Sequence, residues 1–436
     1  MGQAYSGWEL CIVDDASTDP GTLNVLDQTQ KILRGSKNFK FIKRSSQGGI
    51  ACATRDALSL ATAPYVAFVD HDDLLHEDAF LEVALILQQE RRYRLIYTDS
   101  TMIDQAGKRL HIYHKPDWSP ETLRHLNFIN HLTIAQRDLV QQLNCFNDKC
   151  EGGQDWDMLL RLAEVLDVTD VYHIRKPLYS WRASKQSLAY QSSAKPEAFS
   201  AGKYAVLTHM QRKGLRSPSC NTNPIGPGVV CRWQAPQPSV EIIIPTHNNV
   251  SGLKLCVKGI IDDTDYPYIQ LTIIANRCVT PEMLSYLDSL SRYENIKVKT
   301  DDRPFNWASL NNSVALSSDA ELLLFMNDDV EIQADNWLTQ MNQYFDGEQI
   351  AIVGANLYYP NGKLQHNGVH TGLGWVADNI HTTGQFGELS VPRNVAAVTG
   401  ACMLVKRQIY SDIGGFDERF AVNYNDIDFC LAIRHA

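Results

Sequence analysis

The sequence predicts an α/β protein built from two similar domains, and three observations support this prediction. The chain has 436 residues, a length that suits two domains of about 200 residues, each large enough to bury an apolar core. Apolar, strand-like runs alternate with helical stretches, as in a mostly parallel sheet covered by helices. Three segments of the first half also recur in the second half, in the same order.

The alternation of strands and helices is clearest near the start of the chain. We expect strands at residues 10–13, 39–43 and 65–69, and helices near residues 22–34 and 50–60. In open sheets of this kind, ligands bind beyond the carboxyl ends of the strands. Acidic residues follow the first and the third of these strands, so we expect a binding site there.

The internal repeat consists of three paired segments. The first pair is a strand, a polar turn and a helix, the second is a buried strand that runs into acidic residues, and the third has acids before an amphipathic helix. The pairs are residues 8–27 with 270–288, residues 65–73 with 322–330, and residues 154–161 with 425–431. Because the spacing between partners changes little, we interpret the second half as a copy of the first.

The two copies differ at their ends. The second copy opens with an apolar strand at residues 240–246, and the counterpart of that strand would precede Met1. The first copy continues from Asp155 to Arg216, whereas the second copy stops soon after Asp426. We therefore expect the first copy to lack its N-terminal strand and the second copy to lack its C-terminal segment.

A proline-rich stretch separates the copies. Residues 217–238 contain five prolines, and we interpret them as an interdomain linker. The predicted domains are therefore residues 1–216 and residues 239–436.

Charge and composition exclude several classes of protein. The net charge of −10 and the pI near 5.7 argue against nucleic acid as a partner, because a polyanion requires a basic face. No apolar run approaches the roughly 18 to 20 residues that span a bilayer, and no signal-peptide pattern follows Met1. We expect a cytoplasmic protein, with peripheral association at the inner face of the membrane left open. The ten scattered cysteines form no CxxC pair and are interpreted as buried thiols, with structural zinc as the alternative.

Asp70 and Asp72 are candidate metal ligands. Side-chain direction in a strand has period two, so two carboxylates one residue apart point the same way and can share one divalent cation. Oxygen ligands favour Mg²⁺ or Mn²⁺, which would neutralise the diphosphate of a substrate that an acidic protein otherwise repels. The alternative is that these acids cap the next helix. The matching positions Asn327 and Asp329 in the second copy favour the metal site.

Asp14 and Asp15 follow another strand of the same predicted sheet. Their carboxylates could accept hydrogen bonds from a nucleobase imide or a ribose hydroxyl. The alternative is that they are turn residues whose side chains bond to the local backbone, which is our interpretation of Asp19.

Asp155 is the candidate general base for attack by a hydroxyl group. It follows the flexible turn at residues 151–153 and opens a predicted helix, and a carboxylate with a reference pKa of about 3.9 is ionised at neutral pH. Asp157 is interpreted as an N-terminal helix cap.

These motifs resemble those of the tandem-domain family 2 glycosyltransferases with the GT-A fold, which build bacterial surface polysaccharides of the O-antigen type. The resemblance runs over nearly the whole chain. Its most specific motifs are residues 9–19, 47–51, 68–73, 115–121, 153–157, 178–182, 303–307, 325–331 and 414–417.

The resemblance implies a role for each candidate residue of the first copy. It implies that Asp70 and Asp72 form a metal-binding DxD motif for Mn²⁺ or Mg²⁺, and that Asp155 is the catalytic base. It also implies a nucleotide site and an aromatic-Arg motif near the acceptor or the diphosphate, formed by Asp14 or Asp15, Gly49, Trp181 and Arg182. The implied reaction transfers a sugar with inversion from a nucleotide donor, such as a UDP- or dTDP-sugar, to a glycan or lipid-linked glycan.

The second copy departs from the pattern at two places. Ala275 and Asn276 replace the acidic pair, and Asn327 replaces the first acid of the DxD motif. Thr246, Asn276, Asn327, Asp329 and Asp426 would therefore form the corresponding nucleotide, metal and base positions. His173 in the first copy is either a late metal ligand or a structural histidine.

Two other functions remain open from the sequence. A sugar nucleotidyltransferase would carry a Gly-rich loop with Lys or Arg after its first strand, and residues 245–249 do not resemble that loop. A non-catalytic carbohydrate-binding or nucleotide-sugar-binding remnant would explain the missing end segments, whereas the set Asp70, Asp72 and Asp155 argues for catalysis.

Overall fold

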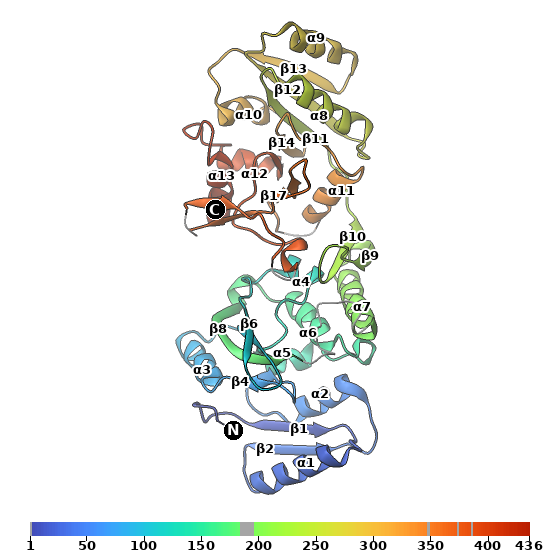
Figure 1. The fold of residues 1–436 in the computed structure, drawn as a ribbon, viewed down its shortest axis with the longest axis vertical. Helices are drawn as coiled ribbons and strands as arrows, with labels where there is room; N and C mark the ends of the chain where they lie inside the picture. Colours follow the sequence, from blue (N-terminus) through green and yellow to red (C-terminus); the bar gives the residue numbers. More distant parts are fainter. Residues whose placement is uncertain (1, 184–195, 347–348, 373–374, 385–386) are drawn as a thin grey trace. The chain divides into compact units, whose positions relative to one another are not determined.

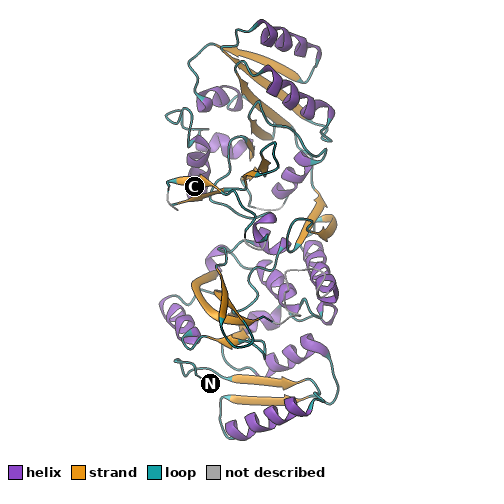
Figure 2. Ribbon diagram, in the orientation of Figure 1, coloured by secondary structure: helices purple, strands orange, loops and turns teal. Residues whose placement is uncertain are grey.

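The computed structural model describes residues 2–183, 196–346, 349–372, 375–384 and 387–436. The chain divides into two compact units (Figures 1 and 2). Unit 1 comprises Met1–Cys231 and Gly384–Asn394, and unit 2 comprises Arg232–Thr383 and Val395–Ala436. The domain limits that we placed around residues 217–238 stay a prediction. Unit 1 also includes Gly384–Asn394, a segment that the sequence places in the second copy.

Unit 1 begins with a small parallel sheet. Strand β1 (Leu10–Asp14) pairs with β2 (Phe39–Lys43), and the helices α1 (Pro20–Leu33) and α2 (Gly49–Leu60) follow them (Figure 1). The side chain of Asp19 accepts a hydrogen bond from the backbone N–H of Thr22 and so caps α1, as expected of a turn acid. The alternating elements predicted for this region are confirmed, with shifts of one or two residues at their ends.

The larger sheet of unit 1 has the strand order β3-β7-β5-β8-β4, with β6 paired to β5. Its strands are β3 (Tyr65–Phe68), β4 (Leu74–Leu75), β5 (Leu95–Ile103), β6 (Arg109–Tyr113), β7 (Thr133–Gln136) and β8 (Val171–Arg182). The remaining helices of the unit are α3 (Ala79–Gln89), α4 (Pro120–His125), α5 (Arg137–Gln142), α6 (Gln154–Ala163) and α7 (Pro196–Arg212). All nine residues of β5 are buried, so β5 forms the centre of this sheet.

The segment predicted as a linker contains a β-hairpin. Strands β9 (Arg216–Thr222) and β10 (Val229–Gln234) pair with each other. Cys220 and Cys231 are buried, with their sulfur atoms 3.1 Å apart. The side-chain amide of Asn223 donates to the hydroxyl of Ser390 at 2.7 Å, which attaches Gly384–Asn394 to unit 1. The prolines of this segment therefore lie in or beside an ordered hairpin, and not in an irregular connection.

Unit 2 has one six-stranded sheet in the order β13-β12-β11-β14-β20-β15. The four strands β11 to β14 are parallel, and β20 is antiparallel to both β14 and β15. Their bounds are β11 (Val240–Thr246), β12 (Ile269–Asn276), β13 (Ile296–Asp301), β14 (Leu322–Met326), β15 (Ile352–Gly354) and β20 (Cys402–Lys406). Two short pairs complete the strands, namely β16 (Leu357–Tyr358) with β17 (Leu364–His366) and β18 (Val369–Thr371) with β19 (Ala377–Asn379).

Helices cover both faces of the sheet of unit 2 (Figure 2). Alternate residues of β14 point to opposite faces, so Leu324 packs with one core cluster and Phe325 with the other. The first cluster includes residues of α8 (Val250–Asp262), α9 (Pro281–Ser289) and α11 (Trp337–Asn342). The second includes residues of α10 (Trp307–Ala315), α12 (Arg407–Ile413) and α13 (Asn425–His435). The prediction of a tandem α/β chain is confirmed.

The pairing registers align the strands of the two units. Tyr65 lies opposite Gln136 in the β3–β7 pair, and Leu322 lies opposite Lys406 in the β14–β20 pair. Strand β3 therefore corresponds to β14 and β7 corresponds to β20. In unit 2, β11 lies between β12 and β14, whereas the described part of unit 1 has no strand between β1 and β3.

Candidate active site

The predicted metal ligands lie at the carboxyl end of β3. The side chains of Asp70 and Asp72 are exposed, whereas that of Asp73 is half-buried. The hydroxyl of Tyr179 and the backbone N–H of Arg182 donate to the Asp73 carboxylate at 2.6 and 2.8 Å. Burial raises the pKa of Asp73, and these hydrogen bonds oppose the increase. Asp73 thus fixes the turn, and the exposed acids of the turn are Asp70 and Asp72.

Arg182 and Trp181 end strand β8 beside this turn. The guanidinium of Arg182 donates to the carbonyl oxygens of Asp72, Asp104 and Gln105 at 2.9 to 3.3 Å. Trp181 is half-buried and packs on the core cluster around β3 and β8. In this structure Arg182 therefore joins the acidic turn to the turn after β5.

The predicted base lies close to one of the predicted metal ligands, Asp70. Asp155 is the second residue of α6, and one imidazole nitrogen of His131, Nε2, lies 3.3 Å from an oxygen of Asp70 and 3.9 Å from an oxygen of Asp155. Burial raises the pKa of Asp155, the charge of Asp70 adds to the increase, and His131 opposes it. Burial alone would lower the pKa of His131, but the hydrogen bond to Asp70 and the charge of Asp155 raise it overall.

The interpretation of Asp157 as a helix cap was wrong. Helix α6 starts at Gln154 with Gly153 at the cap position, so Asp157 lies inside the helix. Its carboxylate is fully buried and pairs with Arg161 at 2.8 Å. The sequence motif placed the start of the helix too late, because a glycine occupies the cap position where a polar side chain is more usual.

Two carboxylates cap the N-terminus of α2, next to β1. Asp15 accepts from the backbone N–H groups of Gly48 and Gly49 at 2.9 and 2.8 Å, and Glu151 accepts from those of Ile50 and Ala51 at 2.6 and 3.1 Å. Gly49 has a φ of +87°, and a Cβ there would lie 2.8 Å from the Glu151 carboxylate. The predicted nucleotide contacts Asp15 and Gly49 are thus bonded to each other in this structure.

Asp14 takes the geometry of a turn acid. Its carboxylate is buried and accepts from the backbone N–H of Ser17 at 3.0 Å. The hydroxyl of Ser17 and the ammonium of Lys43 hold the pKa of Asp14 below its usual value, although burial opposes them. This agrees with the alternative that the sequence left open.

His173 lies in a different cluster from the acidic turn. It bonds to Asp99 at 2.8 Å, stacks on Tyr97 with ring centroids 4.4 Å apart, and lies 3.5 Å from Asp117. These contacts favour a structural histidine. Among the described residues, no group of three or more His, Cys, Asp or Glu side chains is arranged to hold a metal ion. The predicted zinc alternative for the cysteines gains no support there.

In unit 2 the predicted polar residues also bond to the protein. The hydroxyl of Thr246 donates to Asp328 at 2.6 Å, and the side-chain amide of Asn276 donates to the carbonyl oxygens of Asp301 and Arg303 at 2.8 and 2.9 Å. Asp426 accepts from the backbone N–H of Gly400 at 2.8 Å.

The acidic turn of unit 2 follows β14. The backbone N–H of Asn327 donates to the carbonyl oxygen of Ala401 at 3.1 Å, and Asp329 is exposed. Asn327 and Asp329 thus lie at the end of the same strand, as Asp70 and Asp72 do in unit 1.

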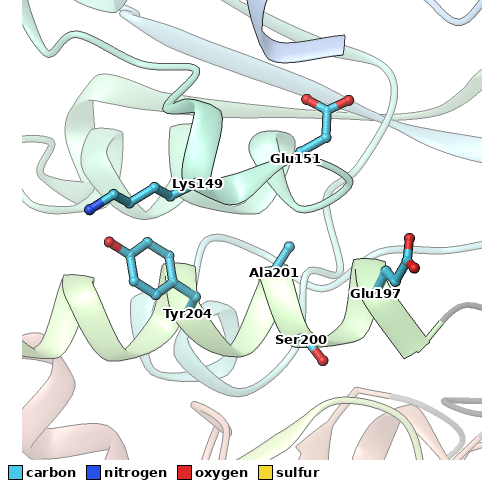
Figure 3. A pocket seen from close by; sticks show the side chains of 6 residues that line it. All are labelled: Lys149, Glu151, Glu197, Ser200, Ala201 and Tyr204. Carbon is cyan, nitrogen blue, oxygen red and sulfur yellow. The ribbon is translucent and has the colours of Figure 1, made fainter. Parts of the chain in front are cut away.

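A pocket of about 510 Å³ adjoins the Glu151 turn and α7. It is lined by Lys149, Glu151, Glu197, Ser200, Ala201 and Tyr204 (Figure 3). The carboxylate of Glu151 points toward α2, away from α7, as its bonds to that helix require. Neither Asp70 nor Asp155 lines this pocket.

Sequence reasoning missed His131, Glu151 and Lys115. The ammonium of Lys115 is buried and donates to the carbonyl oxygen of His131 at 2.6 Å, and burial lowers the pKa of Lys115 to about 7. The available signal for His131 was its place just before the strand that pairs with β3, since an antiparallel neighbour begins where β3 ends.

Comparison with known proteins identifies the class of the chain. The family model described as Glycosyl transferase family 2 matches residues 1–144 and 241–414, which is one segment in each copy. Two such matches over most of the chain show that the family fold is duplicated. The protein belongs to glycosyl transferase family 2.

Two relatives match the chain from end to end. Uncharacterized protein y4gI of Sinorhizobium fredii is 36% identical over 100% of this chain and 48% of its own length. O-antigen biosynthesis protein RfbC of Myxococcus xanthus is 31% identical over 99% of this chain and 34% of its own length. The chain thus spans half or less of these relatives.

Solved structures resemble the chain more distantly. A mannosyltransferase of Pyrobaculum calidifontis in complex with GDP-Man and Mn²⁺ is 12% identical, with a TM-score of 0.35, and the match covers 55% of this chain and 61% of that one. Among the described residues, no helix has the length and apolar composition needed to cross a membrane.

Proposed function

We propose that unit 1 transfers a sugar from a nucleoside-diphosphate donor to a hydroxyl group of a glycan, with inversion at the anomeric carbon. The observation that carries the proposal is the arrangement around His131. An exposed carboxylate of the acidic turn, Asp70, and a partly buried carboxylate at a helix start, Asp155, both lie within 4 Å of one imidazole nitrogen. A ligand for a cation and an acceptor for a proton are the two groups that such a transfer requires.

Asp70 and Asp72 are the proposed ligands of Mn²⁺ or Mg²⁺. They are exposed oxygen donors at a strand end, which fits cations that prefer carboxylate and phosphate oxygens and keep several other ligands. When bound, the cation would neutralise the diphosphate as it leaves. The two side chains bind and orient the donor in this scheme. The net charge of −10 explains why a diphosphate needs such a site.

Asp155 is the proposed general base. In the transfer, the acceptor oxygen forms a bond to the anomeric carbon, the bond from that carbon to the diphosphate oxygen breaks, and the proton of the acceptor hydroxyl passes to Asp155. The partial burial that raises the pKa of Asp155 also makes it a stronger proton acceptor than an exposed aspartate.

Asp14, Asp15, Gly49, Trp181 and Arg182 complete the proposed donor and acceptor site of unit 1. Because Asp15 and Gly49 bond to each other and Arg182 bonds to three carbonyl oxygens, donor binding would exchange some of these contacts.

Unit 2 is proposed as a second nucleotide-sugar site. The residues concerned are Thr246, Asn276, Asn327, Asp329 and Asp426. We infer weaker nucleotide binding than in unit 1, since Ala275 and Asn276 offer no carboxylate to the nucleobase and one metal carboxylate is replaced by an amide.

The biological setting is proposed from the relatives. The name of RfbC indicates O-antigen biosynthesis for that protein, and we propose polysaccharide biosynthesis for this chain too. UDP- or dTDP-sugars are the proposed donors, and a glycan or lipid-linked glycan is the proposed acceptor. The proposed location is the cytoplasm, with peripheral contact at the inner face of the membrane.

The metal requirement can be tested by calorimetry. UDP is titrated into the chain with Mn²⁺ and then with EDTA, and binding should be tighter with Mn²⁺. Asp70→Asn should remove the contribution of unit 1 to this difference, whereas Asp148→Asn, at an exposed acid that pairs with Arg55, should keep it. Equal UDP affinity with Mn²⁺ and EDTA would rule out the metal site.

A further inference from the structure

The backbone and the ring of His131 are both held in place. Lys115 donates to the carbonyl oxygen of His131 at 2.6 Å and also bonds to that of Ile129. The imidazole stacks on Tyr179 with ring centroids 5.2 Å apart and an interplanar angle of 30°. Only 14% of the side chain is exposed. The position of this imidazole is thus fixed by the protein before any substrate binds.

The imidazole of His131 lies close to both the proposed metal ligand and the proposed base. Its Nε2 atom lies 3.3 Å from an oxygen of Asp70, within hydrogen-bonding distance, and 3.9 Å from an oxygen of Asp155. Two carboxylates that approach each other repel, and a donor between them reduces that repulsion. A carboxylate ligand that accepts a hydrogen bond is also held in one orientation, which strengthens metal binding.

Unit 2 provides an internal comparison. The β3–β7 and β14–β20 registers align His131 with Ala401. In agreement, the carbonyl oxygen of Leu132 accepts from Thr98 on β5, and that of Cys402 accepts from the residue just after β15. Unit 2 therefore has no imidazole at this position. The carboxylate at its base position, Asp426, instead accepts a hydrogen bond from the backbone N–H of Gly400.

We propose that His131 is a positioning residue of unit 1, which orients the Asp70 carboxylate through a hydrogen bond and reduces the repulsion between Asp70 and Asp155. This inference rests on the proposed function, because it assigns a role beside the proposed metal ligand and base. It distinguishes the units: unit 1 uses a side chain to set the geometry of its metal carboxylate, and unit 2 relies on backbone groups near Asp426.

The test is direct Mn²⁺ binding to the full chain, measured by electron paramagnetic resonance with Mn²⁺ alone. Removal of an outer hydrogen-bond donor to a metal ligand weakens metal affinity by about 10- to 100-fold, so His131→Ala should weaken Mn²⁺ binding by that factor. His131→Gln keeps an N–H donor and should restore most of the affinity. His131→Leu preserves the contact with Tyr179 without a donor and should behave like His131→Ala, which separates packing from hydrogen bonding.

Two further variants separate the possible failures. His114→Ala removes a histidine that is 76% exposed and pairs with Asp99, and it should leave Mn²⁺ affinity unchanged. Asp70→Asn should reduce Mn²⁺ binding strongly. If Asp70→Asn weakens binding while His131→Ala and His131→Leu match the wild type, the role of His131 is refuted and the metal site stands. If the wild type binds no Mn²⁺, or Asp70→Asn has no effect, both proposals are refuted.

Discussion

Strands β3 and β14 occupy the same place in the two units and differ in how they are covered. All five residues of β14 are buried, and the strand pairs with β11 on one side and β20 on the other. None of the four residues of β3 is fully buried, and its described partner is β7. Similar apolar sequences therefore reach different burial, because the burial of a strand depends on both of its neighbours. The acidic turn of unit 1 extends from the less covered strand.

The largest effect that we expect concerns which unit performs the transfer. Asp155→Asn keeps the size of the side chain but removes the proton acceptor, so transfer should fall by roughly 10²- to 10⁴-fold. Release of the nucleoside diphosphate from a panel of nucleotide sugars, with Mn²⁺ and a glycan acceptor, measures the change. Asp426→Asn is the matched variant, since its amide oxygen can still accept from Gly400. A large loss with Asp426→Asn and none with Asp155→Asn would reverse our assignment of the units.

The difference in strand coverage predicts unequal core contributions from two aligned phenylalanines. Phe325 is fully buried against Tyr410 and Phe416, so Phe325→Ala should lower the free energy of unfolding by about 3 to 5 kcal/mol. Phe68 is half-buried beside Phe146, and Phe68→Ala should cost less. Urea unfolding followed by two probes, one for each unit, measures both values. Equal losses would show that β3 is as well covered as β14.

Acid should lower the stability of unit 1 through Glu9, a carboxylate that is replaced by an uncharged side chain, Gln270, in unit 2. Glu9 precedes β1, and the hydrogen bonds that begin β1 and β12 align it with Gln270. Burial alone would raise the pKa of Glu9, but Lys40, Thr62 and Ala63 lower it from 4.5 to about 2. A carboxyl group whose pKa is lower in the folded state stabilises the fold above pH 4.5, and this contribution is lost as the pH falls from 4.5 toward 2.

Unfolding midpoints measured across this pH range test the assignment to Glu9. Glu9→Gln should flatten the dependence in unit 1, whereas Gln270→Ala should leave the slope of the pH dependence in unit 2 unchanged. An unchanged slope in Glu9→Gln would mean that Glu9 titrates normally in the folded protein.

The smallest effect concerns the N-termini of two helices, α2 in unit 1 and α10 in unit 2. Helix α10 is capped locally, because Asn306 accepts from the N–H of Ser309 at 2.9 Å, whereas α2 depends on the distant Glu151. Gly49→Ala should destabilise unit 1 by about 2 kcal/mol, through strain at positive φ and displacement of Glu151. Gly35→Ala has a similar φ of +84° and open space, so it isolates the strain. Equal thermal shifts would exclude the contact with Glu151.

The sequence was sufficient for the parts of the molecule that depend on local pattern. The strand that ends at Asp14 and the strand that precedes Asp70 were predicted from apolar runs, and the repeat predicted the duplicated fold. The candidate site residues remain proposals, although Asp70 and Asp155, far apart in the sequence, do lie near each other. The role of His131 was missed, because it depends on the pairing of β3 with β7 and on the position of α6.

Other details were missed for physical reasons that can be named. Residues 217–238 were interpreted as a linker from their prolines, yet Cys220, Val229 and Cys231 bury one side of a hairpin. The hydrogen bonds between Glu151 and the N-terminus of α2 join residues about 100 positions apart in the sequence. No local pattern indicates such a contact.

Gly384–Asn394 belongs to unit 1 but lies in the sequence between two segments of unit 2, which affects the order in which the units are synthesised. A ribosome releases the chain from its N-terminus, and domains usually fold as they emerge. Here unit 1 receives its last segment only after β11 to β19 of unit 2 have been synthesised. The hairpin around Asn223 is therefore synthesised well before its partner Ser390, and most of unit 2 is synthesised between them. Translation order thus couples the completion of unit 1 to the synthesis of unit 2.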